Sequence, residues 1–386
     1  MRSEIPRSLQ LSDFIDNKSL FVFGPRATGK TSLIESQLAD RAFIVDLLDS
    51  KFYLPLCENP ARLQEMISLH QDKVVVIDEI QKFPAILDEV HRLIEKEHRI
   101  FLLTGSSARK LKRENANMLG GRASQTHLHP LTWFELDRTK QFDLDRYLRY
   151  GSLPRIYLSN DPQQELYDYV DTYITQEIQI ESEIRNLPAF SRFLRVAALH
   201  SGDLCNYAGT ASDVGLSAKT IKDYFEILDD TLLGYMLTPW RSGKSRKSIA
   251  KAKHYLFDCG VMHTLSRTEF LDRNSNLFGR SFEHFILNEV RAYNSYKRVR
   301  WDLCFWRSKH GAEVDIIIND ECAIEVKSTA KVSNDDIKGL VAIGDEGTWQ
   351  QRILVSQDPI DRYNESGLAI LGWTTFLKKL WQGDIL

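Results

Sequence analysis

The sequence predicts an α/β protein with one β-sheet region near each end of the chain and a mostly helical segment between them. In the first third, unbroken apolar runs at 20–23, 74–77 and 100–103 each end in small or polar residues. Such runs are typical of strands buried on both faces of a parallel sheet. In the last third, segments 312–318 and 322–328 have the composition of two neighbouring strands.

The first apolar run leads into a glycine-rich loop that fits the pattern G-x-x-x-x-G-K-[ST] at every position. Its two glycines let successive backbone N–H groups face inward, which forms an anion site capped by the helix that follows. The lysine would reach the β- and γ-phosphates of ATP, and the threonine hydroxyl would coordinate Mg²⁺. The alternative is a glycine turn without a ligand. The predicted nucleotide-binding residues of this loop are Gly24, Pro25, Arg26, Ala27, Thr28, Gly29, Lys30 and Thr31.

A second motif ends the next predicted strand, where four β-branched residues are followed by Asp78 and Glu79. At the end of a central strand, Asp78 would hold Mg²⁺ and Glu79 would act as general base on the attacking water. The third strand ends in TGSS, where Ser106 is a candidate to sense the γ-phosphate. The alternative for Asp78 and Glu79 is a pair of exposed acids at a strand end. The alternative for TGSS is a tight turn that only reverses the chain.

Several further segments, together with the glycine-rich loop, resemble one known family. They are IDEIQ at 77–81, LTGSS at 103–107, GGRASQTHLHPLTWFEL at 120–136, YGSLPRIYL at 150–158 and GRSFEHFILNEV at 279–290. The set resembles the AAA-type P-loop ATPases of bacteria and archaea that carry a C-terminal domain of unknown function, DUF4143. This resemblance implies that Arg122, in the GR element, acts as an arginine finger on a neighbouring subunit's nucleotide. Pairing of Arg122 with local carboxylates is the alternative.

Composition indicates a soluble, multidomain protein of the cytoplasm. The chain has 386 residues and 43% apolar content, which is enough to build several domain cores. No signal peptide is recognisable and the apolar runs are strand-sized, so no membrane partner is expected. The five cysteines stand singly, which argues for reduced thiols and against a zinc site. The net charge of −3 neither indicates nor excludes nucleic acid.

In the middle of the chain, residues 211–237 have the layout of a helix-turn-helix. Gly215 lies at the turn, and Ser217 is the expected N-cap of the second helix. That helix would show three polar side chains to solvent, namely Lys219, Thr220 and Lys222. Segments 232–240 and 253–257 would then form two strands of a wing around a basic stretch at 241–253. This winged element is predicted to contact DNA, and protein contact is the alternative.

The last third places four charged residues on neighbouring predicted elements. Glu283 lies on a helix, Asp315 on one strand, and Glu325 and Lys327 on the next. Because side chains alternate along a strand, Glu325 and Lys327 share a face. Asp315 beside Glu325 would bind a divalent metal, and Lys327 would orient or activate water against a phosphodiester.

This D-x₉-E-x-K arrangement after an acidic helix resembles the PD-(D/E)xK nuclease superfamily, which includes Holliday-junction resolvases. The resemblance implies an α/β restriction-endonuclease-like fold, with Glu283 as the helix glutamate of the metal site. Val314 stands where the motif usually has proline. The alternative is a buried ion cluster of the acids and Lys327 that cleaves nothing.

The combined prediction divides the chain into four parts. These are an AAA-type ATPase core over 1–140, a helical lid or connector over 141–189, a winged helix-turn-helix over 190–262 and a nuclease-like domain over 263–386. We expect a homo-oligomer, such as a hexameric ring, that uses ATP and Mg²⁺ to act on DNA, including branched DNA such as Holliday junctions. The alternatives are a nucleotide-dependent switch with a protein-docking last domain and an ATP-gated, metal-dependent DNase.

Overall fold

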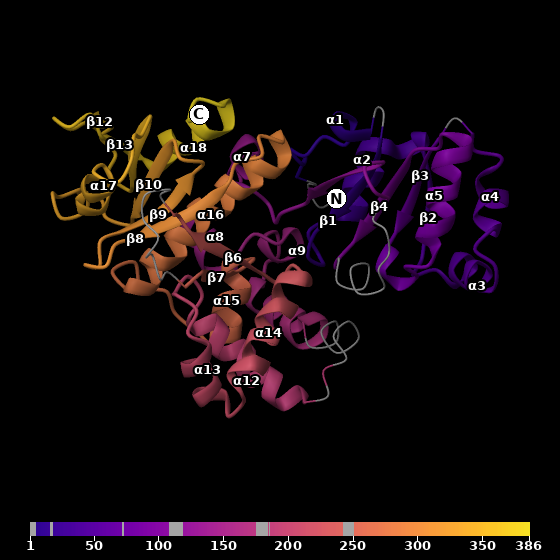
Figure 1. Cartoon of the computed structure of the whole chain (residues 1–386), viewed down its shortest axis with the longest axis horizontal. Coiled ribbons are helices and arrows are strands. Elements are labelled where there is room, and N and C mark those ends of the chain that lie inside the picture. The colour runs from indigo at the N-terminus through magenta and orange to yellow at the C-terminus, as the bar shows by residue number, and fades with distance from the viewer. Residues whose placement is uncertain are drawn as a thin grey trace.

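A computed structural model describes residues 5–15, 18–71, 73–107, 119–174, 184, 186–241 and 251–386. Two predicted features lie largely outside these described residues: the second half of the lid, at 175–183, and the basic wing segment, at 242–250. Figure 1 shows an N-terminal α/β part on the right, a helical part at the bottom and a C-terminal α/β part on the left.

The N-terminal part contains a five-stranded sheet in the order β2-β3-β4-β1-β5, in which every described pairing is parallel. Its strands are β1 (Ser19–Phe23), β2 (Ala42–Asp46), β3 (Val74–Asp78), β4 (Phe101–Gly105) and β5 (Ala123–His127). Because parallel strands end at one edge, the residues that follow β1, β3 and β4 come together there. The register confirms this, since Phe23 lies opposite Gly105.

Successive side chains of β1 point to opposite faces of this sheet, and they fill the core on each face. Leu20 and Val22 join a buried cluster that includes residues of α2, whereas Phe21 and Phe23 join a second cluster that includes residues of α5. Burial on both faces explains the unbroken apolar run in the sequence. The helices of this part are α1 (Ser12–Ile15), α2 (Lys30–Leu38), α3 (Ser50–Glu58), α4 (Arg62–Ile67) and α5 (Ile86–Glu97), with short 3₁₀ turns at Ala39–Arg41 and Ile80–Lys82.

The middle of the chain is helical and contains the predicted helix-turn-helix. Gly215 has a φ of 74°, and the Ser217 side chain accepts a hydrogen bond from the N–H of Thr220, so the turn and the N-cap form as expected. The helices are α7 (Trp133–Arg138), α8 (Leu144–Tyr150), α9 (Pro154–Tyr157), α10 (Pro162–Asp168), a π-helix (Tyr169–Ile174), α12 (Leu187–Leu199), α13 (Tyr207–Val214), α14 (Ala218–Asp230) and α15 (Cys259–Ser266).

The C-terminal part holds an eight-stranded mixed sheet in the order β12-β13-β11-β10-β9-β8-β6-β7. The two predicted wing strands pair antiparallel as β6 and β7, and β6 continues into this sheet by parallel pairing with β8. The predicted wing therefore forms one end of the C-terminal sheet. The strands are β6 (Gly234–Pro239), β7 (Lys253–Leu256), β8 (Leu303–Arg307), β9 (Glu313–Ile318), β10 (Cys322–Lys327), β11 (Gln351–Ser356), β12 (Arg362–Tyr363) and β13 (Ala369–Gly372).

A long helix, α16 (Asn276–Lys297), joins the C-terminal part to the N-terminal part (Figure 1). One continuous buried cluster includes Leu20 of β1, Phe285 of α16 and Trp381 of α18 (Trp373–Gln382). A shorter helix, α17 (Lys338–Ile343), packs against β9 and β10. Within the described ranges, no helix combines the length and the apolar character that a membrane span requires.

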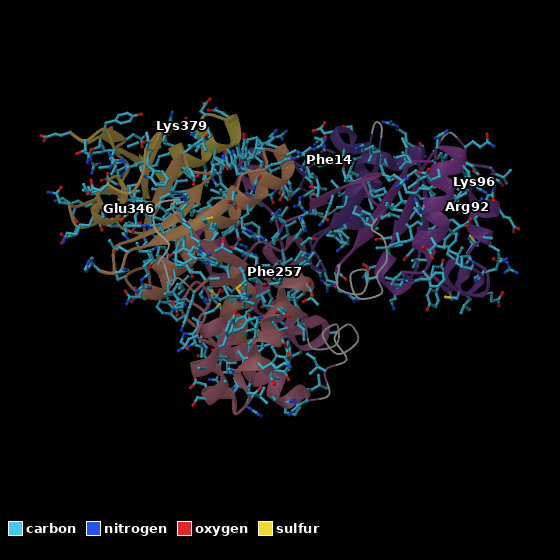
Figure 2. All side chains as sticks on the ribbon, in the orientation of Figure 1. Phe14, Arg92, Lys96, Phe257, Glu346 and Lys379 are labelled. Atoms are coloured by element: carbon cyan, nitrogen blue, oxygen red, sulfur yellow. The ribbon has the colours of Figure 1, made fainter. Side chains whose placement is uncertain are left out.

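The labelled side chains illustrate surface and interior positions. Figure 2 places Arg92 and Lys96 on α5, at the outer side of the N-terminal part, and Phe257 near the middle of the molecule. Phe257 is only 5% exposed and belongs to the core of the helical part. Arg92 and Lys96 thus lie at the outer side of the molecule, and Phe257 lies in its interior.

Candidate functional site

The glycine-rich loop connects β1 to α2 in a tight curl. Gly29 has a φ of 91°, and Ala27 has a φ of 62°. A Cβ on Gly24 would lie 2.5 Å from the carbonyl oxygen of Leu128, so this position requires glycine. The Thr28 hydroxyl donates to the carbonyl of Pro25 at 2.8 Å and fixes the loop from inside.

Lys30 lies inside this curl. Its ammonium donates to the carbonyl oxygens of Gly24, at 2.8 Å, and Pro25, at 3.2 Å. The side chain is buried, and it stands at the first residue of α2, where helix N–H groups favour an anion. Arg26 belongs to the same loop, and its carbonyl accepts a hydrogen bond from the Tyr169 hydroxyl at 3.3 Å. The arrangement provides a cradle for phosphate groups.

Asp78 ties this loop to the neighbouring strand ends. Its Oδ2 accepts from the Thr31 hydroxyl at 3.0 Å, and its Oδ1 accepts from the Thr104 hydroxyl. Asp78 is 6% exposed, so water does not compete with these contacts. A hydroxyl and a carboxylate are the protein ligands that a Mg²⁺ ion bound to a nucleotide uses. The pair Thr31 and Asp78, which the sequence predicted, therefore fits such an ion.

Glu79 and Ser106 are held together by a residue that the sequence analysis did not single out, Gln81. The amide nitrogen of Gln81 donates to the Glu79 carboxylate at 2.5 Å and to the Ser106 hydroxyl at 2.9 Å. Glu79 has a φ of 60°, a strained value for a non-glycine residue at a strand end. Gln81 is buried. Its place in the IDEIQ segment, two residues after Glu79, is the sequence feature that could have predicted it as a site residue.

A cavity of about 440 Å³ opens beside the loop. Its lining includes Gly29, Ser32 and Leu33, which belong to the end of the loop and the first turns of α2. Of the nine other lining residues, five are apolar and four are polar: Ile5, Pro6, Leu131, Pro154 and Leu158, and Arg7, Gln10, Ser36 and Gln37. A cavity with both apolar and polar walls next to a phosphate cradle suits the base and ribose of a nucleotide.

Arg7 connects the loop to the C-terminal part. Its guanidinium donates to the carbonyls of Thr28 and His129, both at 2.6 Å, to Glu135 at 3.1 Å and to the Tyr296 hydroxyl of α16 at 3.1 Å. Burial lowers the pKa of Arg7, but Glu135 and Tyr296 outweigh this and raise it above its ordinary value. Arg7 was not predicted, because these partners are far apart in sequence.

Arg122 lies just before β5. In this chain its guanidinium pairs with Glu95 of α5 and donates to the Gly120 carbonyl at 3.1 Å. The Arg122 side chain is 39% exposed, so it is accessible to another molecule. The local pairing is the one that the sequence analysis gave as an alternative. The role of Arg122 toward a neighbouring subunit stays a prediction.

The four charged residues predicted in the C-terminal part come close together, but Lys253 of β7 lies among them. Its ammonium is 3.2 Å from Glu283 and 3.8 Å from Asp315, and it also contacts Glu313 at 2.5 Å. Lys327 pairs with Glu325. We call these residues, Lys253, Glu283, Glu313, Asp315, Glu325 and Lys327, the C-terminal ion cluster.

The metal role predicted for Glu283, Asp315 and Glu325 stays a prediction. Within the described part of the chain, no group of three or more His, Cys, Asp or Glu residues is arranged to hold a metal ion. Burial and the nearby Glu283 raise the pKa of Asp315 to about 7, and burial and Asp315 raise the pKa of Glu325. The geometry corresponds to the buried ion cluster that the sequence analysis left open.

Family comparisons agree with the two α/β parts. An AAA domain family matches residues 16–136, and DUF4143, a domain of unknown function, matches residues 278–372. Between them, residues 141–272 match DUF8612, also a domain of unknown function. Residues 16–136 are therefore similar to AAA domains and residues 278–372 to DUF4143, which confirms the resemblance and the predicted α/β class. The endonuclease-like details of the last domain and the four boundaries stay predictions.

Similar proteins include uncharacterized proteins of Mycobacterium tuberculosis and Mycobacterium bovis, each 27% identical over 310 residues. These matches cover 76% of this chain and 66% of each relative, just under two thirds of the relative's length. An uncharacterized protein of Methanocaldococcus jannaschii is 24% identical over 346 residues, which cover 82% of this chain and 75% of that protein. A solved structure of the Aeropyrum pernix ORC1 protein in complex with DNA aligns at 14% identity and a TM-score of 0.25, covering 66% of this chain and 87% of that one.

Proposed function

We propose that this chain is an ATP-hydrolysing AAA-type motor that acts on DNA. The observation that carries the proposal is the convergence of the loop, Asp78 and Glu79 at one edge of the parallel sheet. Thr31 and Asp78 would hold Mg²⁺, which supplies charge neutralisation at the phosphates. Lys30 would bind the phosphates, and the cavity beside Leu33 would take the base.

Glu79 would take a proton from the attacking water during hydrolysis. Its carboxylate is oriented by Gln81, which also contacts Ser106, so these three polar groups form one connected unit at the ends of β3 and β4. Such a unit orients a water molecule and responds to the loss of the γ-phosphate. Ser106 acts in this proposal as the sensing residue at the end of β4.

DNA contact is proposed for the helix-turn-helix. Lys219 and Lys222 lie exposed on α14, and Lys222 makes only a loose pair with Glu226 at 3.6 Å. Arg241 and Lys251 stand at the two ends of the basic segment that follows β6. The lysines on this exposed helix, with Arg241 and Lys251 at the ends of the basic segment in the sequence, suit the phosphate backbone of DNA.

Assembly into a homo-oligomer, such as a hexameric ring, is part of this proposal. Arg122 would leave Glu95 and reach the nucleotide of a neighbouring subunit, where it would stabilise the transition state. The exposure of both side chains, 39% for Arg122 and 50% for Glu95, supports such an exchange, because an exposed pair contributes little to stability.

A nucleotide-dependent switch is the second candidate, and the Arg7 contacts favour it. Arg7 bonds both the loop carbonyl of Thr28 and the Tyr296 hydroxyl of α16, so a change in the loop has a direct route to the C-terminal part. In this case nucleotide binding would rearrange the last domain for a protein partner, and DNA would have no role.

The ATP turnover of the full chain, with and without DNA, tests the proposal. We expect single-stranded, duplex, forked and four-way DNA to raise turnover, branched DNA most strongly, and added salt to weaken the effect. Lys219→Glu should reduce the stimulation without lowering turnover in the absence of DNA. Lys378→Glu, which changes an exposed lysine on α18, is the matched control. Turnover that no DNA changes would exclude the motor and favour the switch.

A further inference from the structure

The C-terminal ion cluster is built around a lysine from outside the nuclease-like motif. Lys253 belongs to β7, one of the two predicted wing strands, whereas its acidic partners belong to α16 and β9. Its side chain is 5% exposed. The ammonium approaches three carboxylates, those of Glu283, Glu313 and Asp315. A buried ammonium with this many acidic neighbours is a structural cation rather than a surface charge.

Three acids of the cluster accept hydrogen bonds from further donors of the chain, whereas Glu325 Oε2 is buried and has no hydrogen-bond partner among the described residues. The Tyr255 hydroxyl, two residues along β7, donates to Glu283 at 2.6 Å. The backbone N–H of Val326 donates to Asp315 at 2.9 Å, and Lys327 donates to Glu325. Apart from Glu325 Oε2, the acids are thus oriented toward cations and donors of the chain itself, which leaves less of their coordination capacity for an added ion.

Three carboxylates surround the Lys253 ammonium. Glu283, Glu313 and Asp315 lie 3.2, 2.5 and 3.8 Å from it, and the attraction between opposite charges at these distances holds the ammonium in this place. The cluster then holds four acids, Glu283, Glu313, Asp315 and Glu325, and the ammonium groups of Lys253 and Lys327. A divalent ion needs oxygen ligands at about 2.0–2.6 Å, and an ammonium among the same oxygens repels it and blocks that approach.

We propose that Lys253 is the resident cation of this cluster and takes the place that a divalent ion would have in a nuclease of this residue pattern. The cluster joins β7 to α16 and β9 without a metal, and the DUF4143 domain is not a metal-dependent nuclease. The metal implied by the PD-(D/E)xK resemblance does not fit the residues present. This inference is independent of the ATPase proposal.

Binding of Mn²⁺ to the nucleotide-free full chain tests it. All variants carry Asp78→Asn, so that the ATPase site adds no metal binding. The reference protein retains Lys253 and is called the Lys253 chain. We expect it to bind no Mn²⁺ that Asp315→Asn would remove. Lys253→Met should bind one additional Mn²⁺ per chain. The new site should disappear in Lys253→Met with Asp315→Asn. Lys253→Arg keeps the cation and should gain no site. Free Mn²⁺ is measured by electron paramagnetic resonance.

Thermal unfolding gives a second readout. Mn²⁺ should raise the unfolding temperature of Lys253→Met and leave that of the Lys253 chain and of the double variant unchanged. If Lys253→Met does not fold, the comparison of Mn²⁺ binding by the Lys253 chain and by Asp315→Asn still tests the proposal. Equal Mn²⁺ binding by these two supports the proposal. Asp315-dependent binding in the Lys253 chain, or Mn²⁺-dependent cleavage of four-way DNA that Asp315→Asn abolishes, overturns it. A folded Lys253→Met that gains no site also overturns it.

Discussion

At the scale of single residues, the proposed ATPase site would divide nucleotide binding and hydrolysis between different side chains. Lys30 lies within the loop, 2.8 Å from the Gly24 carbonyl, whereas Glu79 lies at the end of β3 and contacts Gln81 instead of the loop. Lys30 is the only lysine of the phosphate cradle, and in the proposed function Glu79 would provide a carboxylate for proton transfer. Their substitutions should therefore have different consequences.

Lys30→Ala should abolish ATP binding, whereas Glu79→Gln should bind ATP with near-normal affinity and hydrolyse it about 10²- to 10⁴-fold more slowly. The physical reason is that glutamine retains the size of glutamate but accepts no proton. Equilibrium binding of a fluorescent ATP analogue and single-turnover hydrolysis provide the two measurements. Hydrolysis by Glu79→Gln at the rate of the unmodified chain would show that Glu79 is not the base.

At the scale of elements, Glu289 joins α16 to α7 and α18. One carboxylate oxygen accepts from the N–H of Trp133 at 2.6 Å, and the other accepts from the Trp381 indole at 2.9 Å. Glu289 is 1% exposed. Burial raises its pKa to about 8, although the two hydrogen bonds oppose this change. Two other titratable groups face Glu289, namely the Glu135 carboxyl and the Tyr147 hydroxyl.

We predict that the free energy of unfolding falls as the pH rises, between the ordinary glutamate pKa of 4.5 and the folded value of about 8. In this window the folded chain keeps the Glu289 proton that the unfolded chain releases, so the stabilisation is complete below the lower value and lost above the higher one. Urea unfolding at several pH values measures it. The change should be on the order of a few kcal/mol.

Glu289→Gln is the control for this pH dependence, because the amide carries no titrating proton. Asp258 and Asp315 have pKa values raised to about 6 and about 7, so part of the pH dependence should remain in the variant. Only the difference between the two proteins reports on Glu289. If both lose stability equally across the window, Glu289 is ionised in the folded chain and the prediction fails.

At the scale of the whole molecule, the AAA part and the C-terminal part share one core. Phe285 of α16 packs in the same buried cluster as Leu20 of β1, and Arg7 adds a polar link to Tyr296. Two parts with a common core do not move independently without exposing apolar surface. Nucleotide-driven motion is therefore expected between subunits and in the helical part, where Arg122 and α14 act in the proposed motor.

Subunit mixing tests whether Arg122 acts across an interface. Arg122→Ala should bind ATP within a few-fold of normal but turn it over slowly, because a finger acts on the transition state of the adjacent site. Mixed with Glu79→Gln subunits, which retain Arg122, the Arg122→Ala subunits should regain turnover. Activity that no mixing ratio restores would argue that Arg122 acts within its own chain, through Glu95.

The sequence alone determined the features that local geometry fixes. The loop from Gly24 to Thr31, the carboxylates at the end of β3, and the cap at Ser217 depend on dihedral angles, side-chain periodicity and residues a few positions apart. The structure reproduces the loop, the strand ends and the cap in the predicted places. The same rules predicted β6, β7, β9 and β10 as strands, because each has its own apolar pattern.

Only the tertiary structure decided which of these elements meet. Arg7 and Tyr296 are 289 positions apart, and Lys253 reaches Glu283 from a strand assigned to a different predicted domain. No periodicity or spacing encodes such contacts, because packing of the complete chain brings them together. The carboxylates of the last domain show the consequence. The motif predicted a metal site, and the pairing of β6 with β8 places a buried lysine there.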